Sequence, residues 1–273
     1  MQSVVAMLER RGWNISEAML GTLLEFSICA SPLPEALEAY ASLGLSHVPA
    51  SDIAPGAYAV MSGDGLAIGL YEPGADEASG REPAAITPVF VRPELKDHVR
   101  ALRRRGVEFE FLELADDEFH RAGFRDPAGC MFHLIEARTF PPVEARTSTV
   151  AVCGRLVELS LAARALDEPL RFWTALGLEE AGAPPTPHAS VRLHGCGLTI
   201  GLHETTRFAS ALTFRADNLG ARVEYLRAKG FDVRNGSPLT SGHLSATLFA
   251  PGGVQFFIVD ADAFDPPAAQ QAR

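Results

Sequence analysis

The chain has 273 residues, a formal net charge of −10 at neutral pH and four cysteines. This length has room for two ordinary domains, each with its own core. A nucleic-acid binder needs lysine and arginine to neutralise phosphate, so the acidic balance argues against that class of partner. No apolar run is long enough to span a bilayer, so no membrane partner is expected either.

The cysteines and the N-terminus bear on the cellular compartment. None of the four cysteines belongs to a CxxC pair, and free thiols are typical of a reducing compartment. The N-terminus lacks a basic region followed by an apolar core, so we expect no signal peptide. These features together predict a cytoplasmic protein.

The first elements in chain order are two short amphipathic helices predicted within residues 1–21. Val4, Val5, Met7 and Leu8 give the first helix an apolar face. Isolated helices this short are marginal in water, so we expect this N-terminal arm to pack against a domain or another subunit. A homodimer would cover the arm, and two-fold dimers are the commonest assembly.

A strand, a turn and a helix follow, and this unit occurs twice. Residues 24–45, LEFSICASPLPEALEAYASLGL, are echoed by residues 157–178, VELSLAARALDEPLRFWTALGL. Large apolar residues alternate with Glu25 in the strand, which puts the glutamate on the opposite strand face. Apolar residues recur at helical spacing in each helix, and Gly44 or Gly177 supplies the stop.

The repeat continues downstream with the same order of elements. The segment GLAIGLYE at residues 65–72 matches GLTIGLHE at residues 197–204, and a helix ending at Gly106 matches one ending at Gly230. Each copy needs a second one to cover its apolar face, so the repeat determines the architecture. The predicted fold class is α+β, built from tandem duplicated βαβββ modules.

The repeat and the prolines also predict the boundaries and the remaining elements. The predicted parts are an N-terminal helical arm (1–21), a first domain (22–138), a proline-stiffened linker (139–155), a second domain (156–262) and a tail (263–273). Further strands are predicted near residues 46–48, 57–61, 66–71, 85–91, 107–114, 119–124 and 131–135, and near 190–193, 198–202, 210–216, 231–234, 245–249 and 254–259. Further helices are predicted at residues 94–105 and from Asn218, a plausible N-cap.

One strand, one helix and three strands, occurring four times, resemble the vicinal oxygen chelate superfamily of glyoxalases, bleomycin-resistance proteins and extradiol dioxygenases. The most specific segment, DPAGCMFHLIE from Asp126, is similar to the family's DPDGNxxEL segment. Residues 250–253 form a degraded copy of it in the second domain. The resemblance covers nearly all of residues 22–262, and it implies two cupped, incomplete barrels, each made of two modules.

The resemblance also implies where a divalent metal would bind. Family ligands come from the first, fourth, fifth and last strands of a domain, and they are usually His or Gln, Glu, His and Glu. The matching positions in the first domain hold Glu25, Gly69, Ile86 or Thr87, and His133. Those in the second domain hold Glu158, Gly201, Ala211 and Phe257. A divalent metal therefore has candidate ligands only in the first domain, and extradiol dioxygenase activity is not expected.

Glu25 and His133 are the predicted catalytic pair. A carboxylate beside an imidazole can hold one tautomer and raise the imidazole pKa, which suits general acid–base work. Close pairing would raise the pKa of His133 and lower the pKa of Glu25. The alternative is that the two residues form a buried polar pair and simply satisfy each other.

Four other residues are predicted to contact a ligand: Tyr71, Thr87, Glu158 and His203. Tyr71 and His203 occupy matching places at the ends of the fourth strands, where a polar side chain can also simply be solvated. Thr87 is the polar residue at the fifth-strand position of the first domain. Glu158 has no second candidate metal ligand beside it, so it serves either ligand binding or structure.

Two functions remain open from the sequence. One is a glyoxalase-like protein without catalytic metal that binds a small aromatic or apolar molecule in the cup of the first domain. The other is a glyoxalase-type isomerase or lyase that acts on a small oxygenated substrate through Glu25 and His133 as acid–base groups or metal ligands. The missing metal ligands favour small-molecule binding, and the sequence leaves open whether the chain is an enzyme.

Overall fold

The computed structural model describes residues 19–48, 58–72, 86–115, 119–136, 151–240 and 244–261. Nearly all of the predicted N-terminal arm, most of the linker and the predicted tail lie outside the described residues. Among the described helices, none is both long enough and apolar enough to cross a membrane.

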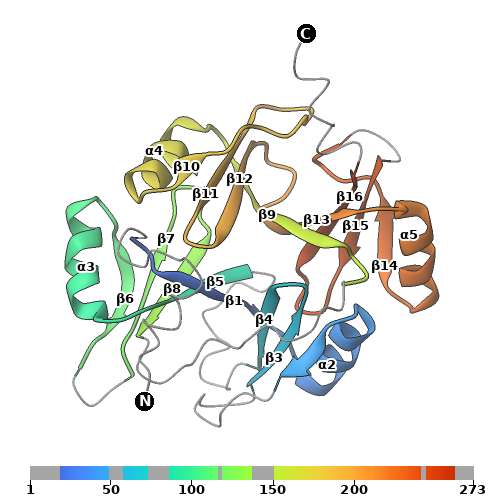
Figure 1. Ribbon diagram of the computed structural model, residues 1–273, viewed down its shortest axis with the longest axis horizontal. Helices are drawn as coiled ribbons and strands as arrows, with labels where there is room; N and C mark the ends of the chain where they lie inside the picture. Colours follow the sequence, from blue (N-terminus) through green and yellow to red (C-terminus); the bar gives the residue numbers. More distant parts are fainter. Residues whose placement is uncertain are drawn as a thin grey trace.

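Two eight-stranded sheets with the same strand order form the molecule (Figure 1). The first sheet has the order β2-β3-β4-β1-β5-β8-β7-β6. Its strands are β1 (Thr22–Cys29), β2 (Ser46–Val48), β3 (Tyr58–Gly63), β4 (Leu66–Tyr71), β5 (Ile86–Arg92), β6 (Phe109–Glu113), β7 (Arg121–Arg125) and β8 (Met131–Glu136). Two helices, α2 (Leu33–Ser42) and α3 (Leu95–Arg104), interrupt this series.

The second sheet repeats the arrangement in the order β10-β11-β12-β9-β13-β16-β15-β14. Its strands are β9 (Arg155–Ala163), β10 (Glu179–Glu180), β11 (Ser190–Gly195), β12 (Leu198–Glu204), β13 (Ser210–Ala216), β14 (Asp232–Asn235), β15 (Ser245–Phe249) and β16 (Gln255–Asp260). Its helices are α4 (Asp167–Ala175) and α5 (Leu219–Ala228).

The predicted α+β fold with duplicated modules is confirmed. In each sheet the two modules join through antiparallel pairing of their first strands, β1 with β5 and β9 with β13. Neither sheet closes into a barrel. The two-residue strand β10 is an element that the sequence patterns did not predict.

The helix ends agree with the predicted stops and with the predicted position of the N-cap. Gly44 and Gly177 follow α2 and α4 with φ values of +88° and +90°, a region that glycine enters without strain. Asn218 is the N-cap residue of α5, but its side chain makes no capping hydrogen bond. The side chain does not cap the helix because Asn218 has φ +55°, in the left-handed region, whereas a capping side chain typically needs an extended backbone.

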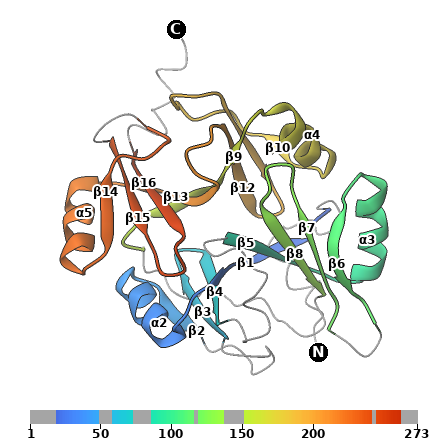
Figure 2. The ribbon, with the colours of Figure 1, turned by 180° about the vertical axis from the view of Figure 1, so that it is seen from behind.

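One apolar core joins the two sheets, because the modules pack crosswise. It includes Phe26 and Phe90 from the first sheet and Phe214 and Phe256 from the second. In both ribbon views α2 lies beside α5 and β14–β16, and α4 lies beside α3 and β6–β8 (Figures 1 and 2). The first helix of each sheet therefore covers the second module of the other sheet.

Two aromatic residues at equivalent positions form hydrogen bonds between the two halves. Tyr40 of α2 donates a hydrogen bond to the carbonyl oxygen of Pro251 at 3.1 Å. Trp173 of α4 donates its indole N–H to Oδ2 of Asp126 at 3.1 Å. Both rings are fully buried. Burial raises the pKa of Asp126 to about 6, although this hydrogen bond and several backbone N–H groups lower it.

Because the core is shared, we predict that the described sheets unfold together in one transition. Tyr40→Phe and Trp173→Phe each remove one buried hydrogen bond and should each cost about 1–3 kcal/mol. Calorimetry of the two variants and the parent chain measures both effects. Two separate transitions, with each variant shifting only one, would show that the halves are independent.

Candidate functional site

The predicted site residues lie on the face of each sheet that is turned away from the shared core. Phe26 and Ile28 of β1 belong to that core, so the alternating residues Glu25 and Ser27 point to the other side. We call this side the cup face. Cross-strand neighbours share a face, so Thr87, opposite Ser27, also belongs to the first cup face.

Glu25 and His133 lie on the same cup face but on strands that do not touch. Glu25 is opposite Val89 of β5, and Val89 is in turn opposite His133 of β8. Two strand spacings therefore separate the glutamate from the histidine, a distance of roughly 10 Å. The imidazole ring instead meets the ring of Phe111 edge-on, with 5.2 Å between their centroids.

Tyr58 of β3 is the residue that contacts the Glu25 carboxyl group. Its hydroxyl donates a 2.5 Å hydrogen bond to Oε2. Glu25 is only 6% exposed, and this burial raises its pKa to about 7, while the bond from Tyr58 lowers it. The direction is opposite to the one predicted for a Glu25–His133 pair, because desolvation outweighs every favourable contact.

A glycine makes room for the carboxyl group in each half. A Cβ atom added at Gly69 would lie 2.1 Å from Oε1 of Glu25, and one at Gly201 would lie 2.3 Å from Oε1 of Glu158. The resemblance places a metal-binding glutamate at these two glycine positions. Here the first-strand carboxyl group fills that space instead.

The matching glutamate of the second sheet, Glu158, sits in a network of hydrogen bonds. It accepts them from Ser160 Oγ at 2.8 Å, Arg192 Nε at 3.0 Å and His203 Nε2 at 2.8 Å. The glutamate is 1% exposed. Burial alone would raise its pKa, but His203, Arg192 and Ser160 together outweigh burial and lower it.

The strand register shows which residues of the first sheet occupy the positions equivalent to Arg192 and His203. Arg192 is opposite Gly201, and Val60 is opposite the equivalent Gly69. His203, the residue before the end of β12, matches Tyr71 at the end of β4. At the positions from which the second sheet supplies an arginine and a histidine, the first sheet therefore supplies a valine and a tyrosine.

The second cup face is packed with its own side chains. His188 Nε2 lies 3.1 Å from His203 Nδ1, and the rings of Phe208 and Phe257 meet edge-on at 5.1 Å. An apolar cluster of Ala211, Leu239, Phe257 and Val259 is fully buried beside them. The two predicted ligand contacts of this half, Glu158 and His203, are thus enclosed by protein, whereas Tyr71 and His133 of the first half are partly exposed.

The donors on the first cup face do not fit the divalent metal that the fold family implies. Within the described ranges, no group of three or more His, Cys, Asp or Glu side chains is arranged to hold an ion. Glu25 is accompanied by Gly69 and Thr87, and His133 is two strands away. His120 and Glu136 form a buried pair with each other instead of joining Glu25.

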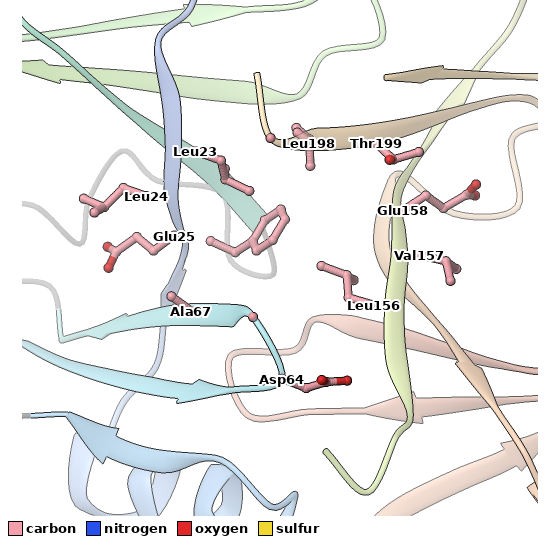
Figure 3. A pocket seen from close by; sticks show the side chains of 13 residues that line it. Leu23, Leu24, Glu25, Asp64, Ala67, Leu156, Val157, Glu158, Leu198 and Thr199 are labelled. Atoms are coloured by element: carbon pink, nitrogen blue, oxygen red, sulfur yellow. The ribbon is translucent and has the colours of Figure 1, made fainter. Parts of the chain in front are cut away.

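A separate cavity of about 240 Å³ lies between β1 and β9 (Figure 3). Both glutamates contribute to its lining, but Figure 3 shows their side chains pointing away from it in opposite directions. This cavity is therefore distinct from the two cup faces.

The fold is shared with solved enzymes of low sequence similarity. The Mn(II)-bound glyoxalase from Novosphingobium aromaticivorans aligns with a TM-score of 0.56 and 14% identity, over 88% of this chain and 82% of the other. A 2,3-dioxygenase from Pseudomonas sp. KL28 aligns with a TM-score of 0.59 and 13% identity, over 91% and 94%. The 2,2',3-trihydroxybiphenyl 1,2-dioxygenase from Sphingomonas wittichii aligns with a TM-score of 0.55 and 16% identity, over 88% and 90%.

These alignments show that the chain has the vicinal oxygen chelate fold, as the sequence resemblance predicted. Its length matches that of proteins with two domains of this fold. No protein-family model matches the sequence, and no curated protein matches it. The fold thus stands on the structural comparison, and the function must be argued from the site.

Tyr58 and Arg192 are the site residues that the sequence analysis missed. Tyr58 begins β3 and Arg192 lies in β11, so each reaches its glutamate across β4 or β12. Aligning the hairpins of the two repeats from Gly65 and Gly197 pairs Arg192 with Val60. A charged residue in one repeat and an apolar residue at the same place in the other would have marked this position in the sequence.

We predict opposite stability effects for two matched substitutions, Glu25→Gln and Glu158→Gln. The pKa of Glu25 is raised from 4.5 to about 7, so its ionisation weakens the fold as the pH rises through this interval. Glu25→Gln should therefore stabilise the protein above pH 7, by up to roughly 3 kcal/mol, and have little effect near pH 4.

Glu158→Gln should destabilise the protein at pH 7, by about 3–5 kcal/mol, because it leaves the Arg192 guanidinium without its carboxylate partner. The pKa of Glu158 is lowered, so its contribution is present above its ordinary pKa and is lost as the pH falls through the folded value. Urea denaturation between pH 4 and pH 8 measures both trends. Equal effects of the two substitutions would contradict the assignment.

Tyr58→Phe should raise the pKa of Glu25 further. The substitution removes the hydrogen bond that favours the carboxylate and leaves the burial that disfavours it. The carboxyl resonance of Glu25 in a ¹³C-labelled protein, followed through a pH titration, measures the shift. An unchanged midpoint would mean that the tyrosine does not control the proton on Glu25.

Proposed function

We propose that the first cup face binds a small organic molecule with an aromatic or apolar body and one hydroxyl or carbonyl group that meets Glu25. The contrast between the two repeats carries this proposal. Glu158 has three hydrogen-bonding partners and is enclosed, whereas Glu25 has Tyr58 and a pKa of about 7. A carboxyl group with only one side-chain partner can form further hydrogen bonds to a ligand.

The neighbours of Glu25 supply apolar and aromatic contacts. Tyr58, Tyr71 and His133 are each partly exposed, and Phe111 packs against the His133 ring. Val89 forms the floor between Glu25 and His133. Ligand sites of this kind combine apolar walls with a few polar groups that fix orientation.

The protonation state of Glu25 favours a neutral ligand. Burial raises the pKa of Glu25 to about 7, so both the protonated and the ionised carboxyl group are accessible near neutral pH. It can then donate to a carbonyl oxygen or accept from a hydroxyl group. An anionic ligand would be repelled by the ionised form and would have to bring a proton with it.

Catalysis of isomerisation or elimination is the second candidate function. A carboxyl group with a pKa near the working pH is suited to general acid–base catalysis. A substrate lying over Val89 would have Glu25 on one side and His133 on the other. The similar structures include a glyoxalase and a dioxygenase named for a hydroxylated biphenyl, which agrees with a small oxygenated substrate for either function.

Binding of 3-hydroxybiphenyl and of biphenyl, measured by titration calorimetry or fluorescence, tests the proposal. The hydroxyl compound should bind at least about tenfold more tightly, because its hydroxyl pairs with a buried carboxyl group. Glu25→Leu should remove this preference. Gly69→Ala should weaken it, because the added Cβ displaces the carboxyl group.

Gly220→Ala in α5, where an added Cβ atom would meet no heavy atom within 4 Å, serves as the matched control and should keep the preference. Equal binding of the two compounds, or a preference that survives Glu25→Leu, would contradict the proposed function. For the catalytic alternative, turnover of the hemithioacetal of methylglyoxal and glutathione should disappear in both Glu25→Gln and His133→Ala.

A further inference from the structure

The cavity between β1 and β9 is built from equivalent parts of the two repeats. Residues 23–26, 64, 65 and 67 line it from the first half, and residues 156–158 and 197–199 line it from the second. The walls include the side chains of Leu23, Leu156 and Leu198, and Figure 3 shows Leu23 and Leu156 turned toward the space between the strands. Its volume of about 240 Å³ exceeds that of apolar cavities that hold benzene, about 150 Å³.

One acidic side chain at this cavity breaks the symmetry of the repeats. The hairpin turn before β4 is Asp64–Gly65, and the equivalent turn before β12 is Cys196–Gly197. Asp64 has φ +48°, a left-handed turn conformation, and its side chain lies at the lower edge of the cavity in Figure 3. Within the part of the chain that the structure describes, Asp64 makes no ion pair or side-chain hydrogen bond.

The other groups around the cavity carry no positive charge. Apart from Asp64, the polar side chains among its lining residues are Thr199 and the two glutamates, which point away. Lysine, arginine and histidine are absent from the lining residues that the structure describes. An acidic group between low-dielectric walls attracts a cation more strongly than the same group in open water.

Strands β1 and β9 pass the cavity before they pair with β4 and β12. Pairing of β1 with β4 starts only at Phe26, and pairing of β9 with β12 starts only at Leu159. Backbone groups of Leu24 and Val157 therefore precede the paired part of each strand on this side. Carbonyl oxygens at such an edge can accept from an ammonium group, which carries three N–H donors and no acceptor.

We propose that this cavity binds a small primary amine with an apolar body, with the ammonium group on Asp64 and the body between Leu23 and Leu156. This site is independent of the first cup face, because its charged residue belongs to a hairpin turn and the Glu25 side chain points away from it. The chemistry required is one positive charge and an apolar group no larger than a single ring.

Benzylamine, benzyl alcohol and benzoate are the probes for a test on the full chain, with binding followed by NMR chemical-shift changes and calorimetry. Benzylamine should bind saturably, and the other two should bind at least about tenfold more weakly. Asp64→Asn should weaken benzylamine binding by about tenfold or more. Asparagine tolerates the left-handed turn conformation, so this variant should fold.

Asp217→Asn changes an exposed aspartate outside the cavity lining, so it is the matched control and should leave benzylamine binding unchanged. If benzylamine binding is lost in Glu25→Gln and kept in Asp64→Asn, the amine binds to the first cup face and the cavity proposal is wrong. Equal binding of benzylamine and benzyl alcohol would overturn it as well. If Asp64→Asn has a lowered melting temperature, Leu156→Trp, which fills the cavity, should abolish benzylamine binding, and unchanged binding would refute the site.

Discussion

Burying a carboxyl group on the first strand of each repeat is the constraint on which both cup faces depend. A carboxylate removed from water must be paired with cations and hydrogen-bond donors, or it must hold a proton. Glu158 meets this requirement with Arg192, His203 and Ser160. Glu25 meets it with one tyrosine hydroxyl and a raised pKa. The same residue at the same place thus has three side-chain partners and a lowered pKa in one half, and one tyrosine partner and a raised pKa in the other.

The packing of the molecule allows the two glutamates to differ in their partners. The sheet faces opposite the two cup faces and all four described helices enclose one shared core. Helices α2 and α4 each cover a module of the other sheet. The cup faces are therefore free of any role in joining the halves. Side chains on one cup face can change, as Val60 differs from Arg192, without altering the contacts that hold the two sheets together.

A buried acid that weakens the fold near neutral pH is more typical of a functional site than of a core. Structural carboxylates lower the free energy of the folded state, as the network around Glu158 does. Glu25 does the reverse above pH 7, and such local costs concentrate at sites that bind or react. This physical contrast between Glu25 and Glu158 is the basis of the small-molecule binding that we propose for the first cup face.

The sequence alone determined the architecture, because two copies with one order of elements can bury their apolar faces only against each other. The alternation around Glu25 also placed the glutamate opposite the core, and the glycine at position 69 was visible as a departure from the family pattern. The tertiary structure decided which partners the two glutamates have and therefore the opposite directions of their pKa shifts. Their partners come from strands β3, β11 and β12, whose contact with β1 or β9 depends on strand order and register and not on local pattern. It likewise decided that Glu25 and His133 stand apart, because β5 lies between β1 and β8 in the sheet.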